Sequence, residues 1–212
     1  MKALIVAAFA ILMALPLRAE GERAGDFDYY VLALTWAPNW CDLEGDDRDA
    51  PQCDPSADAG WTLHGLWPQY IDGWPSYCRT SARDPSRSQT RAEAEVFGSS
   101  SSAWYQWKKH GRCSGLEASE YFDLARNAYQ SVSLPALLRQ LTRPVRLPAS
   151  VVEEAFLQAN PDLSPDQITV TCKNLQIQEV RICLTPDLKP RTCTGPVARD
   201  CTLSGATFNP VR

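Results

Sequence analysis

The chain has 212 residues and a net charge of −4, and 44% of its residues are hydrophobic. A mildly acidic protein is not a bulk electrostatic binder of nucleic acid, so a site for an anion must concentrate its positive charge locally. The length and hydrophobic content suit one domain with its own core.

The first residues have the pattern of a secretory signal peptide. Lys2 gives a basic start, an apolar stretch covers residues 3–17, and Ala19 supplies a small residue before a polar segment. We therefore expect a signal peptide at residues 1–19 and a single mature domain at residues 20–212. A membrane anchor is the alternative, but the apolar stretch is shorter than the ~20 residues that a spanning helix needs.

Eight cysteines all follow the expected signal peptide, and this even number predicts four disulfides. A zinc site is the competing interpretation, but the sequence contains neither a Cys-x-x-Cys pair nor paired histidines. We therefore expect no metal and no other cofactor, and a protein that is secreted or periplasmic. Cysteine spacing alone selects none of the possible pairings.

The first part of the mature chain predicts two strands separated by a loop. Residues 39–60 are acidic and rich in turn formers, which indicates a surface loop, and residues 61–67 predict a short strand that ends at Gly65. Residues 27–36 alternate as a half-buried strand does, and they place on one face Tyr30, Leu32, Leu34 and Trp36.

Two helices are expected in the middle of the chain. A short helix over residues 90–97 stops at Gly98, and the serines at 99–102 can cap a helix that runs from Ala103 to His110 and is closed by Gly111. In this second helix the expected core-facing residues are Trp104 and Trp107.

The remainder predicts two helices followed by two strands. Residues 119–132 carry an apolar stripe, and residues 150–160 form a helix with two acidic residues in its first turn, Glu153 and Glu154. Strands are expected at 168–172 and 179–184. No repeat or linker interrupts this order, so the pattern indicates one α+β domain. The expected stripe consists of Tyr121, Ala125, Ala128 and Val132.

The chain has two histidines, one in "WTLHGLWPQ" and one in "WKKHGRCSG". Helical spacing places Gln106, Lys109 and His110 on one face. An amide, a cation and an imidazole side by side suit an anionic group. The amide and the cation can bind its oxygens, and the imidazole can move a proton. The alternatives are a solvated basic helix end for this face and a satisfied core histidine for His64.

These two segments resemble the signature segments of the ribonuclease T2 family. "FDYYVLALTWAPNWC" is similar to the first strand of that family, and "VTCKNLQIQEVRICL" is similar to its late paired strands. The resemblance implies an α+β domain with a central antiparallel sheet flanked by helices. It also implies a metal-independent endoribonuclease that is secreted or periplasmic.

The resemblance makes the two histidines a catalytic pair. His110 corresponds to the general base toward the 2′-OH of RNA and His64 to the general acid toward the leaving oxygen, although two histidines can exchange these roles. Lys109 corresponds to the residue that stabilises charge on the phosphate. Trp67 and Gln69 correspond to positions that hold a base, with core packing as the alternative for Trp67.

The implied substrate is single-stranded RNA, cleaved through a 2′,3′-cyclic phosphate. DNA lacks the 2′-OH and is not expected to react. We expect a monomer with no membrane partner. A disulfide-stapled structural or protein-binding domain, in which both histidines are incidental, is a further alternative.

Two positions depart from the family pattern. Gln106 stands where the family has a glutamate, and it can donate an N–H to phosphate but carries no negative charge. We therefore expect the pKa of His110 to lie below the family norm. Tyr105 replaces a phosphate-binding histidine and is expected to contact substrate. These departures leave a weak or inactive RNA-binding member as the rival. The disulfides that the resemblance implies are Cys41–Cys53, Cys78–Cys113, Cys172–Cys201 and Cys183–Cys193.

Overall fold

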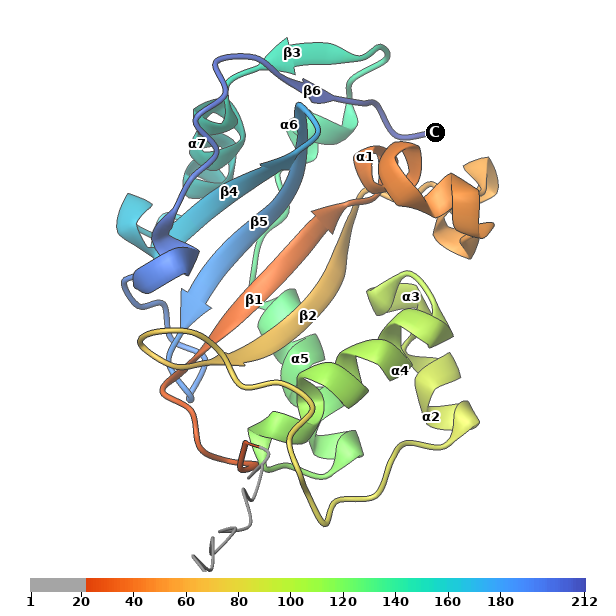
Figure 1. Cartoon of the computed structure of the whole chain (residues 1–212). Coiled ribbons are helices and arrows are strands. Elements are labelled where there is room, and N and C mark those ends of the chain that lie inside the picture. The colour runs from red at the N-terminus through yellow and green to blue at the C-terminus, as the bar shows by residue number, and fades with distance from the viewer. Residues whose placement is uncertain (1–21) are drawn as a thin grey trace, which may run out of the picture.

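The computed structural model describes residues 22–212, and the expected signal peptide lies outside them. In this part of the chain six strands form one sheet in the order β2-β1-β5-β6-β3, and β4 pairs with β5 (Figure 1). All pairings are antiparallel except the parallel contact between β5 and β6. The strands are β1 (Tyr29–Trp36), β2 (Trp61–Gln69), β3 (Val145–Leu147), β4 (Ile168–Lys173), β5 (Gln176–Leu184) and β6 (Ala206–Phe208).

The strand β1 lies between β2 and β5, and both of its faces are buried. The predicted alternation is confirmed, since the predicted face belongs to the main core. The prediction of a half-buried strand is wrong, because the opposite face packs in a second cluster with Cys183, Cys193 and Val197. A strand covered on both faces is apolar at nearly every position. That opposite face consists of Tyr29, Val31 and Ala33.

The helix α5 (Ala118–Gln130) lies behind β1 and β2 (Figure 1). Its predicted stripe is confirmed within the helix, and the hydroxyls of Tyr121 and Tyr129 donate to the carbonyls of Leu66 and Trp61 at 3.0 and 2.9 Å. These bonds attach α5 to β2. They also give each tyrosine hydroxyl a hydrogen-bond partner, which a hydroxyl near the core needs.

The helix α7 (Ala149–Ala159) packs beside β4, and α6 (Ala136–Arg139) precedes it. Its N-cap is Pro148, so the helix begins before Ser150 and its first turn contains no acidic residue. The prediction that Glu153 and Glu154 lie in the first turn is therefore wrong.

Residues 37–57 form successive short helical turns, beginning with α1 (Ala37–Trp40), and not the predicted surface loop. The buried amide of Asn39 donates to the carbonyls of Ile177 and Thr207 at 2.7 and 2.9 Å. Because these carbonyls belong to β5 and β6, the hydrogen bonds of Asn39 attach the segment to the sheet.

Two helices precede the second histidine segment, α2 (Arg87–Ala92) and α3 (Ala94–Phe97), and α4 (Ser100–Lys109) contains the first residues of that segment. The structure therefore has two helices, α2 and α3, where a single helix was expected. The second of them ends at Gly98, as predicted, and φ of Gly98 is +77°. The hydroxyl of Ser99 accepts the N–H of Ser102 at 3.0 Å, so α4 is capped by serine but begins earlier than Ala103.

The structure also corrects the strand predictions. The strand β2 continues past the predicted end at Gly65 to Gln69, while β4 and β5 match their predicted positions within a few residues. The short strands β3 and β6 were not predicted. They have three residues each, and pairing with a distant segment supplies most of what stabilises them.

The four disulfides have the pairing that the resemblance implies, and the described residues contain no free cysteine. Across residues 22–212 no helix is long and apolar enough to cross a membrane. The bridges are Cys41–Cys53, Cys78–Cys113, Cys172–Cys201 and Cys183–Cys193.

Candidate active site

The strand β2 has a β-bulge at His64. Its pairing with β1 shifts register between Leu63 and Gly65, which leaves His64 without a partner in the ladder. Leu63 and Leu66 both belong to the main core, although strict alternation would place them on opposite faces. Bulges re-aim side chains and are frequent beside active sites. His64 is therefore turned out of the core and half-exposed.

A buried carboxylate on β5 holds this histidine. Oε1 of Glu179 lies 2.5 Å from Nδ1 of His64, and Arg181 donates to Oε2 from Nε and Nη2 at 2.9 and 2.6 Å. The Glu179 side chain is 2% exposed. Burial alone would raise the pKa of Glu179, but the charges and hydrogen bonds of His64 and Arg181 outweigh it and lower the pKa to about 2. Because Glu179 is ionised, Nδ1 of His64 is the donor.

The C-terminal end of α4 presents the predicted set of polar groups. Gln106 is buried, Lys109 is half-buried, and His110 is the C-cap of the helix. Trp107 packs in the core as predicted. The prediction for Trp104 is wrong, because this side chain is 38% exposed.

His110 is 5% exposed, and its Nδ1 has no hydrogen-bond partner among the described residues. Burial, helped by the charges of Lys109 and His64, lowers the pKa of His110 to about 3. The main cause is burial and not the missing carboxylate, and the prediction that the pKa lies below the family norm stays a prediction. At neutral pH His110 is uncharged and can accept a proton.

Trp67 contacts both histidines. Its ring stacks on His110 with centroids 5.1 Å apart and an interplanar angle of 26°, and it meets the ring of His64 edge-on at 5.0 Å. Its Nε1 donates to Oε1 of Gln106 at 2.8 Å, and the guanidinium of Arg181 lies 5.5 Å from its ring centroid. Trp67 therefore packs against the candidate catalytic groups, as well as lining a cavity.

Gly65 makes the bond between Trp67 and Gln106 possible. A Cβ at this position would lie 2.3 Å from Nε1 of Trp67 and 2.5 Å from Oε1 of Gln106. No side chain fits there without separating the two groups. The glycine that follows His64 is thus required by close packing, not by a left-handed backbone.

Two cavities share a wall at these groups. One of about 320 Å³ is also lined by Trp67, Gln69, Trp74 and Arg181, and the other, of about 570 Å³, extends to Ser99 and to the helical turns after α1. They form one groove, because the same six side chains line both: His64, Tyr105, Gln106, Lys109, Gln178 and Glu179.

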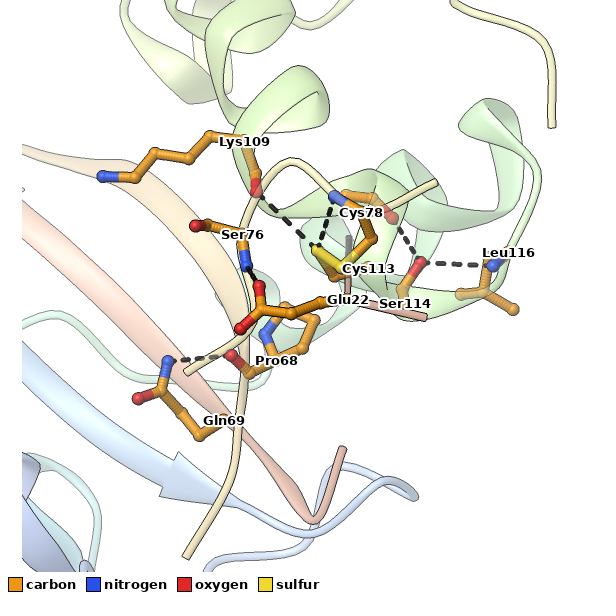
Figure 2. Close-up of a disulfide and its surroundings, with 10 residues drawn as sticks. Glu22, Pro68, Gln69, Ser76, Cys78, Lys109, Cys113, Ser114 and Leu116 are labelled. Atoms are coloured by element: carbon orange, nitrogen blue, oxygen red, sulfur yellow. Dashed lines mark hydrogen bonds between the residues drawn. A yellow bond between two sulfur atoms is a disulfide. The ribbon is translucent and has the colours of Figure 1, made fainter. Parts of the chain in front are cut away.

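The disulfide Cys78–Cys113 attaches the loop after β2 to the 3-10 turn η5 (Gly111–Ser114), which directly follows α4 (Figure 2). Beside it, the N–H of Tyr77 donates to the carbonyl of Lys109 at 2.9 Å. The carbonyl of Lys109 faces the disulfide, whereas its side chain points away from it (Figure 2). The bridge therefore holds the backbone of Lys109 and leaves its ammonium group toward the groove.

The other two predicted substrate-binding residues differ in exposure. Tyr105 is exposed, its hydroxyl lies 3.4 Å from that of Tyr77, and Nζ of Lys109 lies 5.9 Å from its ring centroid. Gln69 is buried, and its amide donates to the carbonyl of Pro68 at 2.9 Å (Figure 2). Both line the groove, but only Tyr105 offers a broad surface.

The residues of the groove that were not predicted include Trp74, Glu179 and Arg181. A signal for two of them exists. Val180 and Ile182 are core residues of β5, so strict alternation places Glu179 and Arg181 together on the other face. The local sequence of β5 does not show which other segments lie against that face. Trp74 lies in a loop and carries no such pattern.

The profile of the Ribonuclease T2 family matches residues 27–193 of this sequence. The chain belongs to the ribonuclease T2 family. A ribonuclease from Aeromonas hydrophila is 42% identical over 121 residues, which are 57% of this chain and 53% of that protein. Ribonuclease 1 from Arabidopsis thaliana is 32% identical over 132 residues, 55% of this chain and 56% of that protein. These alignments span about half the length of the relatives.

Solved structures share the fold of this ribonuclease T2 family member. The RNase-related protein from Calystegia sepium aligns with a TM-score of 0.69 at 24% identity, covering 88% of this chain and 98% of its own. The self-incompatibility associated SF11-RNase of Nicotiana alata aligns with a TM-score of 0.61 at 20% identity, covering 87% of this chain and 100% of its own. At these identities the likeness shows the α+β fold.

Proposed function

We propose that this protein is an endoribonuclease that cleaves single-stranded RNA by transphosphorylation. The observation that carries the proposal is that both histidines of the chain line one groove, together with Gln106 and Lys109. RNA carries its own nucleophile, the 2′-OH. The enzyme must therefore remove that proton, stabilise the phosphorus transition state and protonate the departing 5′-oxygen, and two imidazoles supply both proton transfers.

His110 is the proposed general base. Its burial keeps it uncharged, so it can take the proton of the 2′-OH over a wide pH range. A phosphate bound beside the ring favours the protonated form, because opposite charges attract strongly in a partly desolvated groove. Substrate binding therefore increases the proton affinity of His110 at the point where it is needed.

His64 is the proposed general acid. Its Nδ1 is engaged by Glu179, so Nε2 is the nitrogen that remains to give a proton to the leaving oxygen. The product ends are a 2′,3′-cyclic phosphate and a 5′-hydroxyl, and the cyclic ester is then hydrolysed more slowly. DNA, which lacks the 2′-OH, does not react.

Lys109 and Gln106 are the proposed phosphate-binding groups. Because Oε1 of Gln106 accepts from Trp67, its amide nitrogen is the atom left to donate to a phosphate oxygen. The ammonium group of Lys109 supplies positive charge to the groove of this acidic chain. Loss of one such donor from a transition state costs about 3–4 kcal/mol.

The walls of the groove suit bases. Trp67, Trp74 and Tyr105 offer aromatic surface and Gln69 a polar edge, and single-stranded bases bind by stacking and by hydrogen bonds to their edges. We propose that these residues hold the nucleotides on the two sides of the scissile phosphate, in a monomeric protein.

We also propose that the protein is exported, with a signal peptide at residues 1–19 and one domain at residues 20–212. Four disulfides within the described residues support this, since such bridges persist in oxidising compartments such as the periplasm or the medium. Export has its own test: the N-terminal sequence of the protein recovered outside the cytoplasm should begin near Glu20.

A second candidate is a member that binds RNA with little or no cleavage. The neutral Gln106 favours it, because the site lacks the glutamate that the family pattern has there. The two candidates predict the same affinity for single-stranded RNA but different product formation.

The deciding experiment is cleavage of unstructured RNA by the purified, disulfide-bonded protein in EDTA, from about pH 4 to about pH 8. We expect products with 2′,3′-cyclic ends, and a loss of about 1,000-fold or more in H64A and in H110A, since both proton transfers are needed. Bound but intact RNA would instead support the non-cleaving candidate.

A further inference from the structure

We infer that Glu179, locked by Arg181, is the positioning carboxylate of this site and acts on His64, while position 106 of the site carries no charge. The inference rests on the proposed function and names a residue that the reaction requires. Glu179 is a positioning residue, because it touches His64 and not the reacting atoms.

The sheet brings this carboxylate to His64 across the intervening strand β1. In register, Thr35 of β1 lies opposite Glu179 of β5, and Ala33 lies opposite both Arg181 of β5 and Gly65 of β2. The two β1 side chains on this face are small. Glu179 can therefore reach over β1 to the bulged His64, which a larger residue at either position would obstruct.

Both oxygens of Glu179 are committed. Oε2 accepts two N–H groups of Arg181, and Oε1 faces Nδ1 of His64 at 2.5 Å. A buried carboxylate is costly unless it is paired and fully hydrogen-bonded, and one guanidinium already pairs this one. Arg181, Glu179 and the imidazole of His64 thus form one hydrogen-bonded chain, and the position of Glu179 in that chain determines the orientation of the His64 ring.

The other charged groups near His64 do not replace Glu179 as the hydrogen-bond partner of its ring. Lys109 and His110 face it from the end of α4, but neither of them is a carboxylate. Glu44 faces it from η1 (Cys41–Gly45), but its carboxylate is bonded to Lys173 and Arg48. Glu179 is the carboxylate in direct contact with the ring.

The chemical consequence concerns which nitrogen of His64 holds the proton. An ionised Glu179 accepts only, so neutral His64 carries its hydrogen on Nδ1 and leaves a lone pair on Nε2. When His64 is protonated, the second hydrogen is on Nε2, where it can be transferred to the leaving oxygen. The same negative charge stabilises the imidazolium that the general acid requires.

Substitution E179Q tests this directly. Arg181 has only donors, so it retains the amide oxygen and turns the amide N–H toward Nδ1 of His64. An amide that donates to Nδ1 favours the tautomer of His64 with its hydrogen on Nε2, and it opposes protonation of the His64 ring. We expect kcat to fall about 100-fold or more with little change in KM, and the alkaline limb of the kcat/KM–pH profile to move to lower pH.

Glu93 provides a matched control. It is 6% exposed and bonded to Arg126 at 2.5 Å, and it lines neither cavity of the groove. E93Q therefore removes the charge of a buried carboxylate–arginine pair away from the site. We expect E93Q to lower stability but to leave kcat and the pH profile unchanged. Equal pH profiles for E179Q, E93Q and the unsubstituted protein would overturn the inference.

A measurement without RNA, made on the unsubstituted protein, separates this inference from the proposed function. Nitrogen-15 NMR of the histidine rings, assigned with H64A, reports which nitrogen of neutral His64 is protonated. We expect Nδ1, and a proton on Nε2 would overturn the inference even if the protein cleaves RNA. Conversely, a protein that leaves RNA intact but shows the Nδ1 tautomer would refute the proposed activity alone.

Discussion

At the scale of single residues, one hydrogen bond decides how Gln106 presents itself. Nε1 of Trp67 holds Oε1 of Gln106, and the absence of a side chain at Gly65 leaves room for that bond. The orientation of the amide is therefore imposed by the neighbouring strand. A glutamate at position 106 could accept the same bond with one oxygen and would bring a negative charge beside His110.

Substitution Q106E should consequently raise the pKa of His110, because a carboxylate stabilises the imidazolium that burial now disfavours. The acidic limb of the kcat/KM–pH profile, which reports deprotonation of the base, should move to higher pH by about one unit or more. Steady-state cleavage of a short RNA between about pH 4 and about pH 8 measures it. An unchanged rate and profile would show that position 106 lies outside the working site.

At the scale of elements, the end of α4 depends on the loop that follows β2. The disulfide Cys78–Cys113 and the bond from Tyr77 N–H to the Lys109 carbonyl join the two segments (Figure 2). The bridge closes a separation of 35 residues. Its expected contribution to stability is about 2–4 kcal/mol, and it also limits movement of the helix end that carries Lys109 and His110.

Removing that bridge in the double variant C78S/C113S should therefore lower kcat about tenfold or more, even where the variant is fully folded, since small displacements of catalytic groups are costly. The matched control is C41S/C53S, which removes a bridge within the helical turns after α1. Its expected effect is on stability with a smaller effect on kcat. Circular dichroism confirms folding, and equal losses of kcat in the two variants would contradict the prediction.

At the scale of the whole molecule, the site makes stability depend on pH. His110 has a pKa of about 3 in the folded protein and an ordinary value near 6.5 when unfolded, so the unfolded chain binds this proton first. Stability therefore falls as pH falls from about 6.5 toward about 3. Glu179 acts in a lower window, because its lowered pKa stabilises the fold above about 4.5 and the effect is lost as pH falls toward about 2.

Urea unfolding at about pH 7 and about pH 5 tests the upper window. The unsubstituted protein should lose about 1–2 kcal/mol more of its free energy of unfolding than H110Q does over this interval, because glutamine does not titrate. The comparison isolates His110, since His64 and all carboxylates are common to both proteins. The same pH dependence in both would mean that His110 is not buried uncharged in solution.

Much of the site was predictable because its signals are local. Helical spacing placed Gln106, Lys109 and His110 on one face, and strand alternation separated the two faces of β1. The two histidine segments indicated the family. Each of these signals depends on residues within one element, where the backbone geometry alone relates them.

Tertiary structure decided what depends on contacts between elements. The bulge at His64, the reach of Glu179 across β1, the burial that lowers the pKa of His110 and the exposure of Trp104 each depend on which distant segment lies opposite. Strand register and burial are sums over segments far apart in the chain, so no local pattern contains them. The sequence alone therefore identified the two histidines, Gln106 and Lys109 as the chemical groups of the site. The packing of the sheet against α4 added Glu179 and Arg181 and determined how these groups are oriented and which of them are charged.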